Sequence, residues 1–291
     1  MNLSSSDFEL DQDKFKTVIL KNGLKINTYS DGPSDGIKIL VIHGAQSFIQ
    51  MLSPLITTIS QIYNVLAIDL PGHGQSDQLE QYSLEIIEDI IIEVLEYTNF
   101  YNFYVIGHSF GGYLAVRCGS QAKYQKFNPH GVVSFCPAGL MTLIIKTPMT
   151  PEAEQYIRKD FKNNLLIGFK PKTPNPDLPL WLSELLVDML VNQLASNPDK
   201  SIGIMKFFSQ FKFSERFECF ETANSFDNVN IVYALGDKLV DSVRSHEYIQ
   251  QHYKNISSIV VEGAHEFPMV EPALALEYIK KCVNAGQAKK K

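Results

Sequence analysis

Short apolar runs alternate with longer amphipathic stretches along most of the chain. The runs resemble strands that are buried on both faces of a parallel sheet, and the stretches carry isoleucine and leucine at helical spacing. Ahead of them, Asn22-Gly23 separates two strand-like segments and is a strong hairpin signal. The predicted strands are 17–20, 24–29, 37–42, 63–69, 103–107 and 131–136, and the predicted helices are 48–61, 83–98 and 109–121. This order predicts a mostly parallel sheet with helices on both faces.

The alternation stops between residues 137 and 227, where only helices are predicted, at 151–166, 180–195 and 201–211, divided by the proline-rich KPKTPNPDLP. These stretches carry too many apolar residues to stand in water, so we expect an inserted helical cap. Strands return at 230–235 and 257–261, with helices at 242–253 and 271–284. The predicted organisation is an α/β core of 15–136 and 228–284, a cap of 137–227, a flexible segment of 1–14 and a flexible tail of 285–291.

The composition excludes several classes of protein. Of the 291 residues 45% are hydrophobic, and 26 lysines and arginines stand against 32 aspartates and glutamates, which gives a net charge of −6. Because no basic cluster lies within the core, we expect no nucleic-acid partner. No stretch approaches the ~18 uninterrupted apolar residues of a membrane span, and the first residues lack the pattern of a secretory signal.

Four cysteines lie far apart along the chain, without a CxxC pair: Cys118, Cys136, Cys219 and Cys282. Closely spaced ligands would indicate a metal site, and a disulfide framework is typical of small secreted chains. We therefore expect free buried thiols, no metal ion, no cofactor and a cytoplasmic location.

A serine between glycines, in Gly107-His108-Ser109-Phe110-Gly111, stands where a predicted buried strand passes into a predicted helix. A G-x-S-x-G sequence in this context forms a sharp elbow that exposes the serine hydroxyl, and small residues two positions before and after it avoid clashes. The first free N–H groups of the following helix point at the serine and can bind a developing oxyanion. The pattern therefore indicates a nucleophilic serine.

Four motifs, each at the end of a predicted strand, together resemble the α/β-hydrolase family. They are His43-Gly44, AIDLPGHGQSD at 67–77, GHSFGG at 107–112 and EGAHEFP at 262–268. The resemblance runs from about residue 15 to residue 284, apart from the cap. It implies an α/β-hydrolase fold and a catalytic triad in which Ser109 is the nucleophile and His265, after the last strand, is the base.

The acid of the triad has two possible alignments after the strand that ends near Leu235. Counting from Gly236 puts Leu239 at the acid position, which would abolish the triad. Aligning DKLV with the family pattern D-x-L-V puts Asp237 there, and we prefer this alignment because it keeps NIVY as the strand. Asp241 is the reserve candidate, with a helix cap as its structural interpretation.

The resemblance also assigns the oxyanion hole and several structural residues. The backbone N–H groups of Ala45 and Phe110 are the expected oxyanion donors. His43, His73, Asp69 and Asp77 are expected to be structural, and His108 to point away from the serine; His130, His246 and His252 lie in surface-like contexts.

The cap is rich in phenylalanine, at positions 161, 169, 207, 208, 211, 213, 217 and 220. Most of these rings are expected in packing, and some should line the space above Ser109, because caps in this family cover the active site. We therefore expect a serine hydrolase that cleaves a small carboxylic ester or thioester with an apolar group, through an acyl-enzyme. The alternatives are an acyltransferase, a C–C bond hydrolase or a non-catalytic ligand-binding protein of the same fold. The sequence leaves the oligomeric state open.

Overall fold

The computed structural model describes residues 6, 9–140, 150–159, 180–210 and 214–288. Within them, eight strands form one sheet in the order β1-β2-β4-β3-β5-β6-β7-β8. The first two pairings, β1 with β2 and β2 with β4, are antiparallel, and all later pairings are parallel. The strands are β1 Phe15–Ile19, β2 Lys25–Asp31, β3 Lys38–Ile42, β4 Asn64–Ile68, β5 Phe103–His108, β6 Gly131–Phe135, β7 Val229–Ala234 and β8 Ile256–Val261. The predicted mostly parallel sheet is confirmed.

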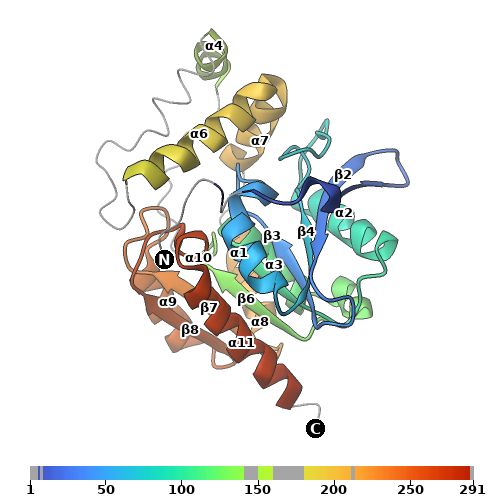
Figure 1. Cartoon of the computed structure of the whole chain (residues 1–291). Helices are drawn as coiled ribbons and strands as arrows, with labels where there is room; N and C mark the ends of the chain where they lie inside the picture. Colours follow the sequence, from blue (N-terminus) through green and yellow to red (C-terminus); the bar gives the residue numbers. More distant parts are fainter. Residues whose placement is uncertain (1–5, 7–8, 141–149, 160–179, 211–213, 289–291) are drawn as a thin grey trace.

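Helices cover both faces of this sheet (Figure 1). One face packs against α2 Leu84–Tyr97, α3 Phe110–Ser120, α8 Ser214–Ala223 and α9 Ser242–His252. The other packs against α1 Ser53–Ser60, α10 Phe267–Val270 and α11 Pro272–Ala288. Each face has its own apolar core because side chains alternate along the strands: Leu40 belongs to the first core, and its neighbours Ile39 and Val41 to the second.

Local signals in the sequence produce the predicted ends of two elements. The β1–β2 hairpin turns at Gly23, whose φ of 85° suits glycine, and the Gly23 N–H donates to the carbonyl of Leu20 at 2.8 Å. Helix α2 begins after Ser83, whose hydroxyl accepts a hydrogen bond from the N–H of Ile86 at 3.2 Å. The sequence predicted this hairpin and a helix that begins at residue 83.

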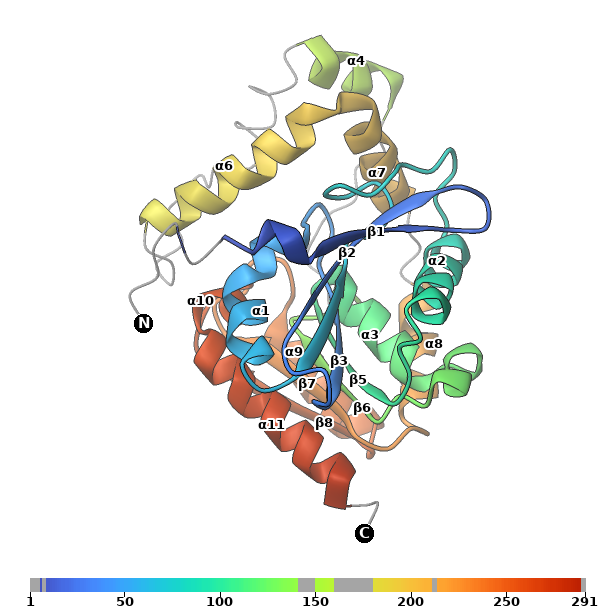
Figure 2. The same cartoon turned by 45° about the vertical axis from the view of Figure 1, so that its right-hand side comes forward.

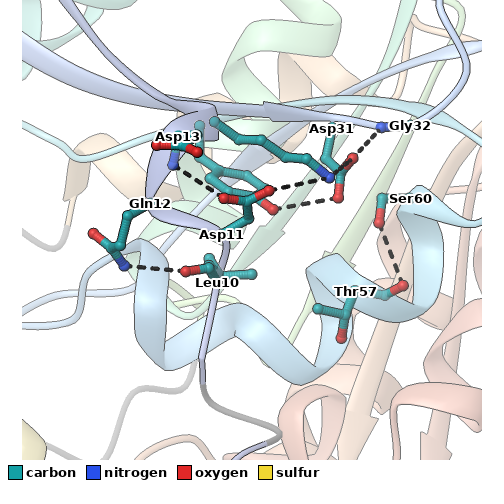
Figure 3. A network of polar contacts seen from close by, with 10 residues as sticks. Leu10, Asp11, Gln12, Asp13, Asp31, Gly32, Thr57 and Ser60 are labelled. Atoms are coloured by element: carbon teal, nitrogen blue, oxygen red, sulfur yellow. Dashed lines mark hydrogen bonds and ion pairs between the residues drawn. The ribbon is translucent and has the colours of Figure 1, made fainter.

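The first described residues are more closely packed than the polar sequence predicted. Leu10 is buried in the core beside α1, and a short 3₁₀ helix, Gln12–Lys14, follows it. Lys14 pairs with Asp31 of β2 at 2.7 Å, and Gln12 donates to the carbonyl of Leu10 at 3.0 Å (Figure 3). One leucine within a polar segment therefore anchors residues 9–14, where we had expected a flexible segment of 1–14.

The C-terminal end also differs from the expected tail of 285–291. Helix α11 continues to Ala288, because Cys282, Val283 and Gly286 still face the protein interior. The predicted end at residue 284 was therefore too early, and residues 289–291 lie outside the described part of the chain.

Helices α6 Leu180–Ser196 and α7 Pro198–Gln210 lie beyond one end of the sheet domain, with α4 Pro151–Lys159 further out (Figures 1 and 2). These three correspond to the predicted cap helices. Residues 160–166 of the first predicted helix and the proline-rich 170–179 lie outside the described residues. Helix α8, which we had counted within the cap of 137–227, instead packs on the sheet, with Cys219 and Phe220 buried in the first core.

None of the helices in the described ranges combines the length and the apolar character that crossing a membrane requires.

Candidate active site

Ser109 occupies a strained turn between β5 and α3. Its φ of 56° and ψ of −118° lie in a region that non-glycine residues rarely adopt, and such strain is concentrated at functional sites. A side chain at Gly107 would collide with the carbonyl of Gly111, and one at Gly111 would collide with the carbonyl of Ile42. The glycines on both sides of the serine are therefore required by close backbone approach.

Main-chain hydrogen bonds hold the elbow in place. The N–H of Ser109 donates to the carbonyl of Phe135 at 2.9 Å, at the end of the neighbouring β6. The carbonyl of Ser109 accepts from Tyr113 at 3.1 Å and from Ala138 at 3.0 Å. The Ser109 side chain remains partly exposed, so it is accessible to a ligand.

Asp237 and His265 follow the ends of β7 and β8, which are neighbours in the sheet. The Nδ1 atom of His265 lies 2.7 Å from the carboxylate of Asp237. The other carboxylate oxygen accepts hydrogen bonds from the N–H groups of Leu239 at 2.7 Å and Val240 at 2.9 Å, so the loop itself fixes the orientation of the Asp237 side chain. The preferred alignment of DKLV therefore places the carboxylate against the predicted base.

Each partner of this buried pair stabilises the charged form of the other. Burial works to lower the pKa of His265, but the hydrogen bond and charge of Asp237 outweigh burial and raise that pKa above its ordinary value. Burial works to raise the pKa of Asp237, but His265 and two backbone N–H groups hold it below its ordinary value. At neutral pH the carboxylate is ionised and can stabilise an imidazolium.

The two rival positions for the acid have other roles. Asp241 caps α9, where its carboxylate accepts the N–H of Arg244 at 3.1 Å. This is the structural interpretation that the sequence offered for Asp241. Leu239 is 39% exposed on the turn after β7.

The structure does not join Ser109 to His265 by a hydrogen bond: among the bonds of the described residues, those of His265 go to Asp237 and His108. The carbonyl of His265 nevertheless lies 2.8 Å from Nε2 of His108, the residue next to the serine. Hydrogen bonds between nucleophile and base are often long without substrate and tighten in the reacting complex. The three residues of the predicted triad therefore lie at the same edge of the sheet, after β5, β7 and β8, and His108 links the base position to the residue beside Ser109.

His108 contacts His265, the predicted base, and sequence reasoning missed this contact. Its Nε2–H donates to the His265 carbonyl, and the two rings lie 4.7 Å apart between centroids. Burial, followed by the nearby His265, lowers the pKa of His108 to about 3, so its ring stays neutral. The two residues are 157 positions apart, and no local pattern announces their contact.

We expect replacement of His108 by phenylalanine to reduce kcat by roughly 10²-fold and leave KM nearly unchanged, because a small displacement of the base carries such a loss. Phenylalanine keeps a ring against His265 and removes the N–H donor. His108→Gln restores a donor and should recover part of kcat. Steady-state kinetics with a thermal melt of each variant tests this, and an unchanged kcat in folded His108→Phe would contradict it.

The expected oxyanion donors come from two loops beside the serine. Phe110 is the first residue of α3 and directly follows Ser109. Ala45 lies in a turn closed by the N–H of Ser47 on the carbonyl of Gly44, at 3.3 Å. A side-chain carbon at Gly44 would lie 3.0 Å from Cβ of Ser109, so the turn that carries Ala45 packs directly against this serine.

Two buried histidines support this turn. His43 accepts the N–H of Leu70 at 2.9 Å on Nε2, and its Nδ1–H donates to the carbonyl of Gly44 at 2.7 Å. His73 accepts the N–H of Gln46 at 3.1 Å. Burial lowers the pKa of His43 to about 4, so the ring stays neutral and keeps both bonds. These contacts are structural, as the sequence suggested for both residues.

The two aspartates of DLPGHGQSD also hold loops. Asp69 is fully buried and accepts hydrogen bonds from the Asn27 side chain and from the N–H groups of Ile49 and Gln75. Asp77 accepts the N–H of Lys25 at 2.9 Å.

Within the described residues, Cys136 is the one cysteine whose sulfur lies beside the predicted triad. Its Sγ, an oxygen of Asp237 and a ring nitrogen of His265 all lie within 4.8 Å of one another. Burial, followed by the charge of Asp237, raises the pKa of the Cys136 thiol well above its ordinary value, so the thiol is protonated at neutral pH. All four cysteines are free and buried, as the sequence predicted.

A profile of the alpha/beta hydrolase family matches residues 39–276. This range includes the elbow, the acid loop and His265, and the order of the strands fits the match. The chain therefore belongs to the alpha/beta hydrolase family, which confirms the resemblance found in the sequence.

Known relatives match the chain to different extents. The "Putative esterase/lipase" of Haemophilus influenzae is 21% identical over 254 residues, which cover 84% of this chain and 83% of that protein. The 3-oxoadipate enol-lactonase 1 of Acinetobacter baylyi is 25% identical over 99 residues, 34% of this chain and 37% of that protein.

Solved structures share the architecture. The enol-lactonase from Burkholderia xenovorans LB400 has a TM-score of 0.73 at 14% identity, covering 92% of this chain and 100% of its own. The naproxen esterase from Bacillus subtilis has a TM-score of 0.65 at 16% identity, covering 92% of this chain and 90% of its own. At these identities the likeness establishes the fold.

Proposed function

We propose that this hydrolase cleaves a carboxylic ester or thioester with an apolar group, through an acyl-enzyme on Ser109. The strained serine carries the proposal, because it stands at the same sheet edge as a buried Asp237–His265 pair with a 2.7 Å contact. The similarity to a Haemophilus influenzae protein named as an esterase/lipase supports the ester as substrate.

In the proposed reaction, His265 Nε2 takes the proton of Ser109 as the hydroxyl oxygen attacks the ester carbonyl carbon. The negative charge that develops on the carbonyl oxygen is held by the N–H groups of Ala45 and Phe110. His265 then gives its proton to the leaving oxygen or sulfur, and the carbon–heteroatom bond breaks. Water, activated by the same base, hydrolyses the acyl-enzyme.

Contacts of α6 and α7 support a cap over this site. Leu186 of α6 packs in one cluster with Phe48 and Met51, which follow the Ala45 turn, and with Val270, which follows His265. Helix α7 approaches the elbow itself, because the ring of Phe208 lies 4.8 Å from that of Phe110 at an angle of 89°. An apolar surface therefore stands next to the nucleophile, and an apolar acyl or alkyl group suits it.

Most of the cap phenylalanines are not among the side chains near the elbow. Residues 161, 169, 211 and 213 lie outside the described residues, the side chain at 217 is not described, and Phe220 packs in the core against Tyr253. Phe207 and Phe208 are the two described cap phenylalanines close to the elbow, each with its ring near that of Phe110.

The function predicts a dependence on acyl-chain length. For p-nitrophenyl esters, kcat/KM should rise with each methylene that is fully buried, by about 0.8 kcal/mol each, until the apolar space is filled. Phe208→Ala should move the optimum toward longer chains. Met205→Ala is the control, because Met205 lies on the same helix and packs instead toward Ile202.

Equal kcat/KM for all chain lengths, or the same shift in both variants, would contradict an apolar site under α7. Absence of turnover with every ester and thioester would favour the alternatives of acyl transfer, C–C bond hydrolysis or ligand binding without catalysis. The last of these was suggested by the ambiguous acid, and the contact of Asp237 with His265 weakens that reason.

A further inference from the structure

A third residue with a metal-binding side chain adjoins the Asp237–His265 pair and has no part in the proposed reaction. Cys136 directly follows β6, and its N–H donates to the carbonyl of Val232 on β7 at 2.8 Å. Its φ of 45° is unusual for a residue other than glycine, and a conformation of this kind persists only where the surroundings hold it. The strand pairing thus fixes Cys136 next to the loop that carries Asp237.

We propose that Cys136, Asp237 and His265 form an inhibitory binding site for a thiophilic divalent cation such as Zn²⁺. The three donors are a thiol sulfur, a carboxylate oxygen and an imidazole nitrogen, and all lie within 4.8 Å of one another. Around a tetrahedral zinc ion, with bonds of about 2.0–2.3 Å, such donors stand about 3.5 Å apart. Shifts of about 1 Å therefore convert the cluster into three ligands of one ion.

The charges also balance. On binding, the Cys136 thiol loses its proton to solvent and the proton of neutral His265 moves from Nδ1 to Nε2, while Asp237 already carries its negative charge. One thiolate and one carboxylate neutralise a divalent cation, which suits a site where Cys136 is 0% and His265 is 6% exposed. A fourth ligand is supplied by water, as in open zinc sites.

Such an ion would stop the proposed catalysis by taking over the base. With the cation on Nδ1 and the ring proton on Nε2, the imidazole loses its hydrogen bond to Asp237 and has no free nitrogen to accept the proton of Ser109. The binding of the ion does not depend on the proposed function, but its inhibitory effect rests on it.

Binding is best measured without turnover, in untagged full-length protein carrying Ser109→Ala. Calorimetry with Zn²⁺ should give one ion per chain, and Co²⁺ should produce a thiolate-to-cobalt charge-transfer band in the near ultraviolet. Adding Cys136→Ser should weaken Zn²⁺ binding by roughly 100-fold or more and remove the band, because a ligand is lost. Cys282→Ser, which changes another buried free thiol, is the matched control and should retain both signals.

A second arm measures inhibition in protein with Ser109 intact. For each protein, the rate of ester hydrolysis with Zn²⁺ is divided by the rate without it. This ratio should fall well below one in wild type and in Cys282→Ser, and much less in Cys136→Ser or Cys136→Ala. Thermal melts exclude unfolding as the cause. Each variant serves as its own reference, so a change in basal rate cancels.

The outcomes separate the two proposals. Equal Zn²⁺ affinity in the Cys136 variants and their parent, or a cobalt band that survives them, would overturn the metal site. Binding that depends on Cys136 in a protein without any ester turnover would leave the site standing and overturn the ester hydrolase instead.

Discussion

Replacing Ser109 by alanine is expected to reduce ester turnover by on the order of 10⁴- to 10⁶-fold, because the acyl-enzyme cannot form without the hydroxyl. The fold should be unaffected, since the elbow is held by main-chain hydrogen bonds and by its glycines rather than by the Ser109 side chain. The measurements are p-nitrophenyl ester hydrolysis and covalent labelling by a fluorophosphonate, with mass spectrometry to identify the labelled residue.

Ser134 offers a matched control for this experiment. It lies on the adjacent β6 and is fully buried, and its hydroxyl has no hydrogen-bond partner among the residues that the structure describes. Ser134→Ala should therefore retain both turnover and labelling. Near-wild-type turnover in Ser109→Ala, or a label that maps to another serine, would rule out the proposed mechanism.

Asp237→Asn is expected to lower kcat by about 10³- to 10⁴-fold. The amide can donate a hydrogen bond to Nδ1 of His265, and the ring proton then lies on Nε2. Nε2 must be unprotonated to accept the proton of Ser109, so this tautomer is inactive. An amide also cannot stabilise the imidazolium. Asp241→Asn is the matched control and should have little effect, because asparagine caps helices as well as aspartate does.

The pH profile of the same variants carries a second expectation. The base must be neutral, so kcat/KM falls as pH drops through the pKa of His265. Because Asp237 raises that pKa, its replacement should move the acidic limb of the residual activity to lower pH. A large loss in Asp241→Asn instead would assign the acid to Asp241, and two silent variants would indicate a Ser–His dyad or a protein that is not chiefly a catalyst.

The predictions that succeeded from sequence rested on patterns with a local physical cause. Asn22-Gly23 predicted the hairpin because of the turn that it favours, and the glycines around Ser109 predicted an elbow because no larger residue fits there. The spacing of DKLV relative to the end of a strand singled out Asp237 as the partner of His265, and in the structure its carboxylate lies 2.7 Å from Nδ1 of that residue. Its role as the acid stays a prediction.

The features that sequence reasoning missed depend on contacts between distant segments. His108 bonds to a carbonyl 157 positions away, and Cys136 reaches Asp237 only because β6 and β7 are neighbours in the sheet. The wide spacing of the cysteines along the chain gave no indication of a metal site. Spacing alone cannot show which strand ends lie next to one another in the sheet. The predicted boundaries of the flexible ends were wrong for a related reason. Leu10 and the last turns of α11 are ordered because they pack against distant parts of the chain.

Strands β6 and β7 pair directly, with Val132 opposite Val229, although residues 137–227 intervene between them. Closing a flexible loop costs only about 0.6 kcal/mol more for each doubling of its length. The part of this segment ahead of α8 can therefore be lengthened, shortened or exchanged in evolution at small cost to the sheet, whereas α8 belongs to the core. The residues at the strand ends are left in place. The same arrangement slows folding, because β6 must find β7 across a long stretch of chain before either is paired on both sides. This topology favours rapid diversification of substrates over rapid folding.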